Sequence, residues 1–421
     1  MDANTDVNTG NLSAVEREAI AYLRSPAAIR ERCGQLFDLA CQDQLQHFRC
    51  DLSKLESVAD YVIQVTQQVY PDLQIPFHSR WRHFEVGTRK QRLAQLDQRL
   101  AHLFPIEKAE AKFDLAITSV LLDAGAGATW QYIESETGEV FCRSEGLAVA
   151  SFNLFCDGLF SSDRQTLQAD AAGLQQLTES DLTQGFQVTD ENPLVGLQGR
   201  LNLLRNLGKV LSQHSELFGS EQPRPGHLVR YLVDQAVDGK LPTNAVLQAV
   251  LAGLGDIWAG RIAIAHVNLG DVWTHPALRD TGFGSQLVPF HKLSQWLTYS
   301  LLEPLQELGL EITGLDQLTG LPEYRNGGLC LDLGLLQAKH AAVTQTPHLP
   351  QSEVIVEWRS LTVILLDHIA TAIRTKLGME ETALPLVKVL QGGTWSAGRQ
   401  IAATLRGGAP PIQLESDGTV F

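Results

Sequence analysis

The sequence contains no long hydrophobic run that is free of charge, and basic residues are in the minority. Its most apolar stretch, residues 245–272, includes Asp256, Arg261 and Asp271. Charges are costly inside a bilayer, so this stretch does not predict a membrane span. Lys and Arg number 33 against 48 Asp and Glu, which gives a formal net charge of -15. Because nucleic acid and anionic membranes bind broad basic surfaces, we expect neither as a partner, whereas a phosphate ester needs only a local basic cluster.

Motifs typical of secretion, cofactor binding or metal binding are also missing. The N-terminal residues MDANTDVNTGNLS are polar and acidic, so we expect no signal peptide and a cytoplasmic protein. The six cysteines form no CxxC pair, which favours reduced thiols. The sequence has no Walker loop, GxSxG elbow or dinucleotide fingerprint, and the spacing of His266, Asp271 and His275 matches no common zinc pattern. We therefore expect no cofactor and no metal.

Helical patterns dominate the chain. Ser13 with Glu16 and Ser53 with Glu56 fit the capping box, and apolar residues at helical spacing follow both pairs. No strands and helices alternate as in an α/β protein, so the sequence predicts a mainly α fold. Further helices are expected over residues 26–42, 108–123, 145–160, 193–218, 226–238, 243–259, 286–308, 352–377, 381–390 and 396–406. The tail PPIQLESDGTVF alternates enough to predict a terminal strand or hairpin.

No flexible linker divides the chain. There is no Gly/Ser-rich, Pro-rich or strongly charged stretch at which to place a boundary. We therefore expect a single compact, multi-lobed helical domain, in which an N-terminal helical segment (residues 1–70) packs on a main catalytic body (residues 71–421).

Residues 312–336 are the stretch richest in candidate functional groups. They contain Asp316, Glu323, Arg325 and Asp332 between several glycines and a proline. Glycine costs a helix interior roughly 1 kcal/mol and proline about 3 kcal/mol, so we expect an ordered loop, the kind of segment that often carries binding and catalytic residues. A structural ion pair between Glu323 and Arg325 is the alternative interpretation.

A second candidate is the basic and aromatic segment PFHSRWRHFEV, residues 76–86. Arginine binds phosphate or carboxylate through paired hydrogen bonds, and neighbouring rings keep it oriented. The functional interpretation is an anion clamp formed by His78, Arg80, Arg82 and His83. The alternative is a solvated basic loop paired with Glu85 and other surface acids.

Two further carboxylates follow or lie within apolar helices. Asp123 ends an apolar segment and precedes the small residues AGAGA, which would let a ligand approach the backbone. It is either functional or the cap of the next turn. Glu357 and Arg359 lie near the start of an otherwise apolar helix, where they either meet counterions in the core or face a pocket.

Together, several segments resemble the uracil-catabolism protein family. They are PFHSRWRHFEVG, FDLAITSVLLDAGAGATW, LTGLPEYRNGGL, VEWRSLTVILLD, GGTWSAGRQIA and the terminal SDGTVF. The resemblance implies a role in a pyrimidine degradation route that makes the nucleotide, opens its ring and releases urea. EGLAVASFNLFCDGLF, NLLRNLGKVL and PFHKLSQWLTYSLL, with the LPEYRNGGL and VEWR segments, also resemble the queuosine-salvage N-glycosidases, which implies a fold like that of helical DNA glycosylases.

Both resemblances imply cleavage of a bond between a pentose phosphate and a nitrogen. The expected substrate is a small phosphorylated pyrimidine-derived compound, ureido-ribose 5-phosphate or similar, and the products are urea and ribose 5-phosphate. Such a reaction needs a carboxylate against the sugar, for which Asp316 or Glu323 is expected. Asp123 or Glu357 is expected as a second carboxylate that activates water or holds the ureido group. The expected substrate-binding residues are His78, Arg80, Arg82, His83, Trp130, Arg325, Asp332, Arg359 and Trp395.

Two other functions agree with the same residues. An amidohydrolase acting on the same intermediates would favour a metal. A non-catalytic nucleotide-binding or scaffold subunit would bind the phosphate without turnover, and charge-neutral substitutions would then weaken only its affinity.

Overall fold

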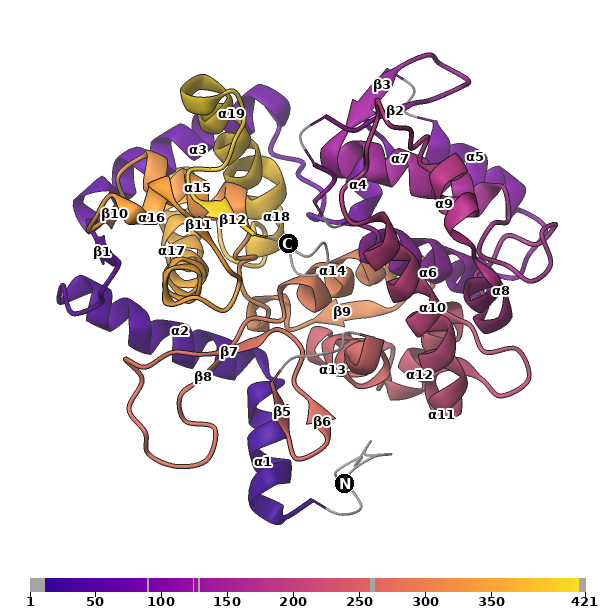
Figure 1. Cartoon of the computed structure of the whole chain (residues 1–421), viewed down its shortest axis with the longest axis horizontal. Coiled ribbons are helices and arrows are strands. Elements are labelled where there is room, and N and C mark those ends of the chain that lie inside the picture. Colours follow the sequence, from indigo (N-terminus) through magenta and orange to yellow (C-terminus); the bar gives the residue numbers. More distant parts are fainter. Residues whose placement is uncertain (1–11, 89–90, 124, 128, 258–261, 416–421) are drawn as a thin grey trace.

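The computed structural model describes residues 12–88, 91–123, 125–127, 129–257 and 262–415. Helices make up most of these residues, which confirms the predicted mainly α fold. Figure 1 shows two groups of helices on either side of α14 (Lys292–Glu307): α4 to α12 on one side, and α2, α3 and α15 to α19 on the other. None of the described helices is long and apolar enough to cross a bilayer.

The helices are distributed along the whole chain. In the first third they are α1 (Ala14–Leu23), α2 (Pro26–Cys41), α3 (Leu55–Val69), α4 (Arg80–Phe84), α5 (Arg92–Arg99) and α6 (Pro105–Leu121). Before α14 they are α7 (Arg143–Cys156), α8 (Ala171–Gln176), α9 (Glu179–Gly185), α10 (Leu197–Gln213), α11 (Ser215–Phe218), α12 (Leu228–Gln235) and α13 (Thr243–Leu254). After α14 they are α15 (Tyr324–Asp332), α16 (Ala342–Gln345), α17 (Glu353–Leu377), α18 (Leu386–Val389) and α19 (Trp395–Arg406).

The strands are short and pair two by two. The antiparallel pairs are β1 (Phe48–Cys50) with β10 (Leu336–Ala338), β2 (Gln131–Ile133) with β3 (Val140–Cys142), β5 (Ala263–Ile264) with β6 (Val267–Asn268), and β7 (Val272–Thr274) with β8 (Leu287–Pro289). The parallel pairs are β4 (Lys240–Pro242) with β9 (Glu311–Thr313), and β11 (Pro347–His348) with β12 (Gln413–Leu414). β12 confirms the predicted terminal strand, and residues 416–421 lie outside the described part.

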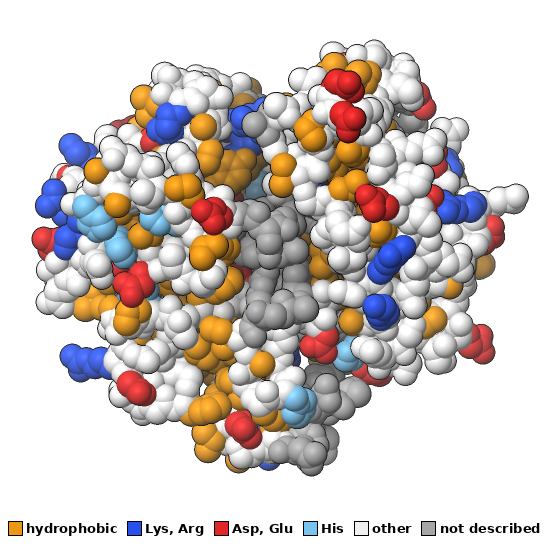
Figure 2. Space-filling view, viewed as in Figure 1, with side chains coloured by type: hydrophobic (Ala, Val, Ile, Leu, Met, Phe, Trp, Pro, Cys, Tyr) orange, Lys and Arg blue, Asp and Glu red, His pale blue; other side chains and the backbone are white. Residues whose placement is uncertain are grey.

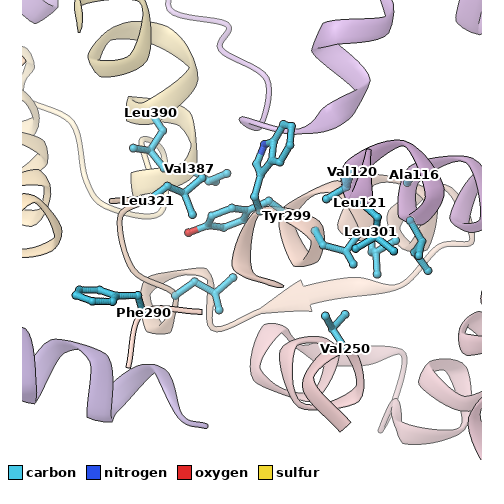
Figure 3. Packing of buried hydrophobic residues seen from close by; sticks show 14 of the residues in the cluster. Ala116, Val120, Leu121, Val250, Phe290, Tyr299, Leu301, Leu321, Val387 and Leu390 are labelled. Carbon is cyan, nitrogen blue, oxygen red and sulfur yellow. The ribbon is translucent and has the colours of Figure 1, made fainter. Parts of the chain in front are cut away.

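Helix α14 joins the two groups of helices through their common hydrophobic core. Most of its residues from Ser294 to Leu305 are buried. Figure 3 shows Tyr299 pointing toward Leu321, whereas Leu301 lies with Val120 and Leu121 of the α6 region. Full burial of one large apolar side chain contributes about 1.5–3 kcal/mol to the stability of the fold. The first turn of α14 is therefore held in a fixed position between the two groups.

Residues 312–336 do not form the single loop that the glycines predicted. The segment contains the end of β9, the 3-10 turn η4 (Leu315–Gln317) and helix α15, which includes Gly327 and Gly328. A Cβ atom on Gly327 would lie 2.6 Å from Trp358 Nε1, so glycine is required here for α15 to approach α17 closely. The energetic cost of glycine in a helix is offset by this packing.

Local signals had mixed success. The capping box of Ser13 and Glu16 is present at the start of α1. The Ser53 and Glu56 box is wrong, because α3 begins at Leu55 without a side-chain cap and the Ser53 hydroxyl donates to Asp51 Oδ1 at 2.5 Å. The helix expected over residues 193–218 is divided into α10 and α11, with His214 between them.

Candidate functional site

A cavity of about 500 Å³ lies between the two groups of helices. The molecule is hollowed at this place in the space-filling view, between the α19 side and the α7 side (Figure 2). Its wall includes four large aromatic side chains, Tyr324, Trp296, Trp358 and Trp395. The ionisable groups on the wall other than Tyr324 are His78, His83, Asp123, Arg143, Lys292, Glu323 and Arg325. The basic segment around residue 80 and the segment 312–336 thus contribute to one pocket.

Glu323 is a carboxylate fixed by a helix end. It is the N-cap residue of α15, and its Oε2 and Oε1 accept the backbone N–H groups of Arg325 at 2.8 Å and Asn326 at 2.6 Å. Burial raises the pKa of Glu323, although these hydrogen bonds and the nearby Lys292 act in the opposite direction. The cap therefore holds a carboxylate at the cavity wall in one orientation.

Asp123 is the second carboxylate on the wall, and two protein side chains, Ser144 and Arg80, fix its position. It follows α6, its Oδ2 accepts the Ser144 hydroxyl at 2.8 Å, and its Oδ1 lies 3.1 Å from Arg80 Nη1. Arg80 is fully buried and also donates through Nε to Ser119 Oγ at 2.8 Å. Arg80 is therefore a positioning group for Asp123, with Asp123 between it and the cavity.

His78 and His83 form a ring cluster with two of the indoles. The centre of the His83 ring lies 5.5 Å from the ring centre of Trp296 and 5.6 Å from that of Trp395. The centre of the His78 ring lies 6.3 Å and 6.0 Å from the same two ring centres. Burial lowers the pKa of His78 to about 4, and burial together with Arg80 lowers the pKa of His83 well below its ordinary value. Both rings are thus neutral at neutral pH and offer hydrogen bonds rather than charge.

Arg325 provides a positive charge on the wall. Its guanidinium carbon lies 4.6 Å from the centre of the Trp395 ring, and its Nε donates to the Tyr324 hydroxyl at 3.1 Å. Arg143 is on the same wall, where its Nη1 donates to the carbonyl of Gly408 at 3.2 Å. A guanidinium held on an aromatic face keeps donors for a planar or tetrahedral anion.

Lys292 is a third cation, at the first position of α14. His291, the residue before it, has a left-handed backbone with φ of 46° and is held by a 2.8 Å contact between its Nε2 and the Leu23 carbonyl. Lys292 Nζ lies 5.9 Å from the centre of the Trp296 ring. Both the left-handed residue and a cation at the positive end of a helix cost energy. Local backbone and helix-dipole preferences therefore do not explain a lysine at this position.

The structure does not assemble the predicted four-residue anion clamp. Arg82 Nη2 binds Glu303 Oε2 at 2.7 Å, away from the cavity, and Arg80 is engaged with Asp123. His78 and His83 reach the cavity but are uncharged near neutral pH. The segment therefore supplies two neutral rings and one positioning arginine.

The two other carboxylates expected in catalysis lie outside the cavity. Asp316 is exposed on the 3-10 turn η4. Glu357 is fully buried, and it accepts the backbone N–H groups of Gln46, His47 and Phe48 at 3.2, 3.0 and 3.1 Å. Glu357 thus holds the chain that leads into β1.

Three expected binding residues also have partners elsewhere. Arg359 binds both carboxylate oxygens of Asp271, at 2.8 and 2.7 Å. Asp332 Oδ2 accepts a hydrogen bond from Arg406 Nη2 at 2.5 Å. Trp130 is buried and donates to the Phe186 carbonyl at 2.9 Å. Each of these contacts stabilises the packing of helices or loops around the cavity.

Sequence reasoning missed Lys292, Trp296, Trp358, Tyr324, Arg143 and Ser144 on the cavity side. One signal was available: Lys292 and Trp296 are four residues apart at the start of a helix, and such residues share a face. Within the described residues, no three of His, Cys, Asp and Glu come together as metal ligands would.

These features define a mainly helical protein with a pocket between two groups of helices, and the wall of this pocket carries both acidic and basic side chains. The chain belongs to the family described as "Protein of unknown function (DUF1688)", whose model matches residues 22–421. It is similar to "Uracil catabolism protein 4" of Lachancea kluyveri, with 40% identity over 96% of this chain and 99% of that protein. It is equally similar to "Protein urg3" of Schizosaccharomyces pombe, with 40% identity over 96% of this chain and 99% of that protein. The resemblance to the uracil-catabolism family is confirmed.

Proposed function

We propose that this protein acts in uracil degradation and hydrolyses the N-glycosidic bond of a ring-opened pyrimidine nucleotide of the ureido-ribose 5-phosphate type. The name of the Lachancea kluyveri relative supports the route, and the 40% identity extends over nearly the whole length of both chains. The pocket supports the reaction. The observation that carries the proposal is that two carboxylates from distant segments, Glu323 and Asp123, lie on the wall of one cavity together with cations and indoles.

Glu323 has the properties that the sugar side of the reaction requires. Cleavage of a bond between C1 and nitrogen develops positive charge on the ribose, and a fixed carboxylate stabilises that charge without reorganising. The two backbone hydrogen bonds to Glu323 hold its oxygens in place before substrate binds. We assign to Glu323 the position facing the anomeric carbon.

Asp123 is suited to the leaving-group or water side. Its Oδ2 already accepts the Ser144 hydroxyl, and its Oδ1 lies 3.1 Å from Arg80 Nη1. An ionised carboxylate accepts hydrogen bonds from the N–H groups of a ureido group or from an attacking water. We assign Asp123 one of these two tasks.

The 5-phosphate fits the guanidinium side of the wall. Arg325 and Arg143 both lie on the cavity, and arginine binds phosphate through paired hydrogen bonds. The binding energy of the phosphate would place the sugar against Glu323. The indoles of Trp296 and Trp395 exclude water from the reacting end.

The test is the release of urea and ribose 5-phosphate from synthetic ureido-ribose 5-phosphate by the purified protein, with a chelator in the buffer. Release of both products supports the proposal. Binding without release, seen as a rise in unfolding temperature, would instead support a non-catalytic nucleotide-binding subunit. Release of ammonia without ribose 5-phosphate would indicate an amidohydrolase.

A further inference from the structure

Within the described part of the chain, Lys292 differs from the other cations of the cavity in having no hydrogen-bond or ion-pair partner for its amine. Arg143 donates to the Gly408 carbonyl and Arg325 to the Tyr324 hydroxyl. Lys292 Nζ makes no hydrogen bond or ion pair with any of the residues that the structure describes, although Lys292 is on the cavity wall. An amine kept free at a cavity wall is available to a ligand.

Lys292 shares the cavity wall with both carboxylates of the proposed reaction, Glu323 and Asp123. The acidic groups that act on it most strongly are Glu323 and then Asp123, the two carboxylates of the cavity. Trp296, four residues further along α14, lies beside its amine. If Glu323 faces the anomeric carbon, as the proposed function holds, that carbon is bound in the same cavity that the Lys292 amine lines.

We propose that Lys292 is the nucleophile of the reaction and forms a transient imine with C1 of the sugar. This inference rests on the proposed function, because it takes the ribose 5-phosphate unit as the group that is bound. Lysine amines form such adducts with carbonyl carbons when they are kept free and desolvated.

The atoms and electrons of this route balance. The neutral amine attacks C1, the bond between C1 and the urea nitrogen breaks, and that nitrogen keeps the electron pair and takes the proton lost by the lysine. The ring oxygen then leaves C1, takes up a proton and becomes a hydroxyl, which leaves a protonated imine. Water adds to the imine, and the carbon to nitrogen bond breaks to give ribose 5-phosphate and the protonated amine.

Burial supports the chemistry, since it lowers the pKa of Lys292 and so increases the fraction of neutral amine. Glu323 and Asp123 oppose this shift, and in this route these two carboxylates of the same cavity accept and return the protons. A lysine that only bound phosphate would need no such neutral form.

The experiment is reductive trapping of the full chain with ribose 5-phosphate and sodium cyanoborohydride, followed by proteolysis and mass spectrometry. We expect one reduced sugar phosphate per chain, on the peptide that contains Lys292. Lys292→Arg keeps the charge but cannot form the imine, so this adduct should vanish and urea release should fall by at least about 100-fold. Lys209→Arg is the matched control on the exposed face of α10 and should leave both results unchanged.

Other results would overturn the inference. Adducts spread over surface lysines, equally in the wild type and in Lys292→Arg, would show only non-specific glycation. Lys292→Arg with urea release within about threefold of wild type would make the lysine a simple cation. Trapping on Lys292 without any urea release would keep the inference and refute the proposed leaving group, so the two failures are distinguishable.

Discussion

Arg80 Nη1 lies 3.1 Å from Asp123 Oδ1, and the arginine is fully buried whereas the aspartate reaches the cavity. Arg80 begins α4 and Asp123 follows α6, so this ion pair joins two helices directly behind the pocket. The backbone N–H of Arg80 also donates to Ser300 Oγ at 2.9 Å, which ties the pair to the central helix α14. The position of a cavity carboxylate therefore depends on the core of the fold.

Replacing Arg80 should be far more harmful than replacing its neighbour Arg82. Arg80→Met leaves Asp123 without its buried partner, and loss of one member of a buried pair costs about 3–5 kcal/mol. Arg82 pairs with Glu303 where both side chains are about a quarter exposed, so Arg82→Met should cost about 1 kcal/mol or less. Guanidinium denaturation of the two variants checks the difference. Equal losses would show that the contact with Asp123 contributes nothing special to stability.

Glu323→Gln should lose urea release while the protein stays folded. Loss of a fixed charge at the developing cation is expected to lower kcat by about 10²–10³-fold, and loss of the N-cap should cost about 1 kcal/mol. Asp316→Asn is the matched control, because Asp316 is exposed on the same segment. Turnover should be measured under single-turnover conditions, with the unfolding temperature recorded in parallel. A silent Glu323→Gln and an inactive Asp316→Asn would reverse the assignment.

The choice between these two carboxylates marks the limit of what the sequence predicts. Apolar spacing placed α17 almost correctly, at Glu353–Leu377 against an expected 352–377. Clusters of charged, aromatic and glycine residues, together with the family resemblance, selected the segments that contribute Glu323, Asp123, His83 and Trp395 to the pocket. Spacing along the chain carries no information on which side of a segment faces a distant helix, so Asp316 and Glu323 remained equivalent.

Lys292 and Glu357 show the same limit in two ways: the sequence analysis missed Lys292, and it expected Glu357 in the site although Glu357 lies elsewhere. Lys292 lies in a segment that the sequence assigned only to a helix, and it directly follows His291, whose left-handed backbone no sequence pattern indicated. Glu357 looked functional because an isolated charge in an apolar helix is costly. The structure compensates that charge with backbone N–H groups 309 to 311 residues away in the sequence, and no local pattern encodes such a contact.

The stability of the protein should fall between pH 6.5 and pH 4 partly because of His78. Its pKa is lowered by burial from 6.5 to about 4, so in this range the unfolded chain binds a proton that native His78 does not bind. The free energy of unfolding attributable to this group is present above pH 6.5 and is lost as the pH falls. The shift in the pKa of His78 corresponds to a loss of about 3 kcal/mol in the free energy of unfolding. Guanidinium denaturation at a series of pH values measures it.

The contribution of His78 is isolated by comparing variants. His78→Asn retains a donor for Gln391 Oε1, which lies 3.0 Å from His78 Nδ1, and removes the titrating ring. Between pH 6.5 and pH 4, the free energy of unfolding of this variant should fall by about 3 kcal/mol less than that of the wild type. His102→Asn, on an exposed side chain, should follow the wild type. Parallel curves for His78→Asn and the wild type would contradict a neutral, buried His78.

Glu357→Gln should lower stability and leave turnover intact. The amide of glutamine places an N–H₂ group against one or two of the three backbone N–H donors that Glu357 now accepts, from Gln46, His47 and Phe48. Unsatisfied buried donors cost about 1–3 kcal/mol. Urea release, measured well below the unfolding temperature, should stay within about twofold of wild type, because Glu357 is not on the cavity wall. Glu353→Gln, in the first turn of the same helix with its side chain 41% exposed, should change stability by about 0.5 kcal/mol or less. A Glu357→Gln protein of full stability but without turnover would show that this carboxylate takes part in the reaction, and it would refute the structural role.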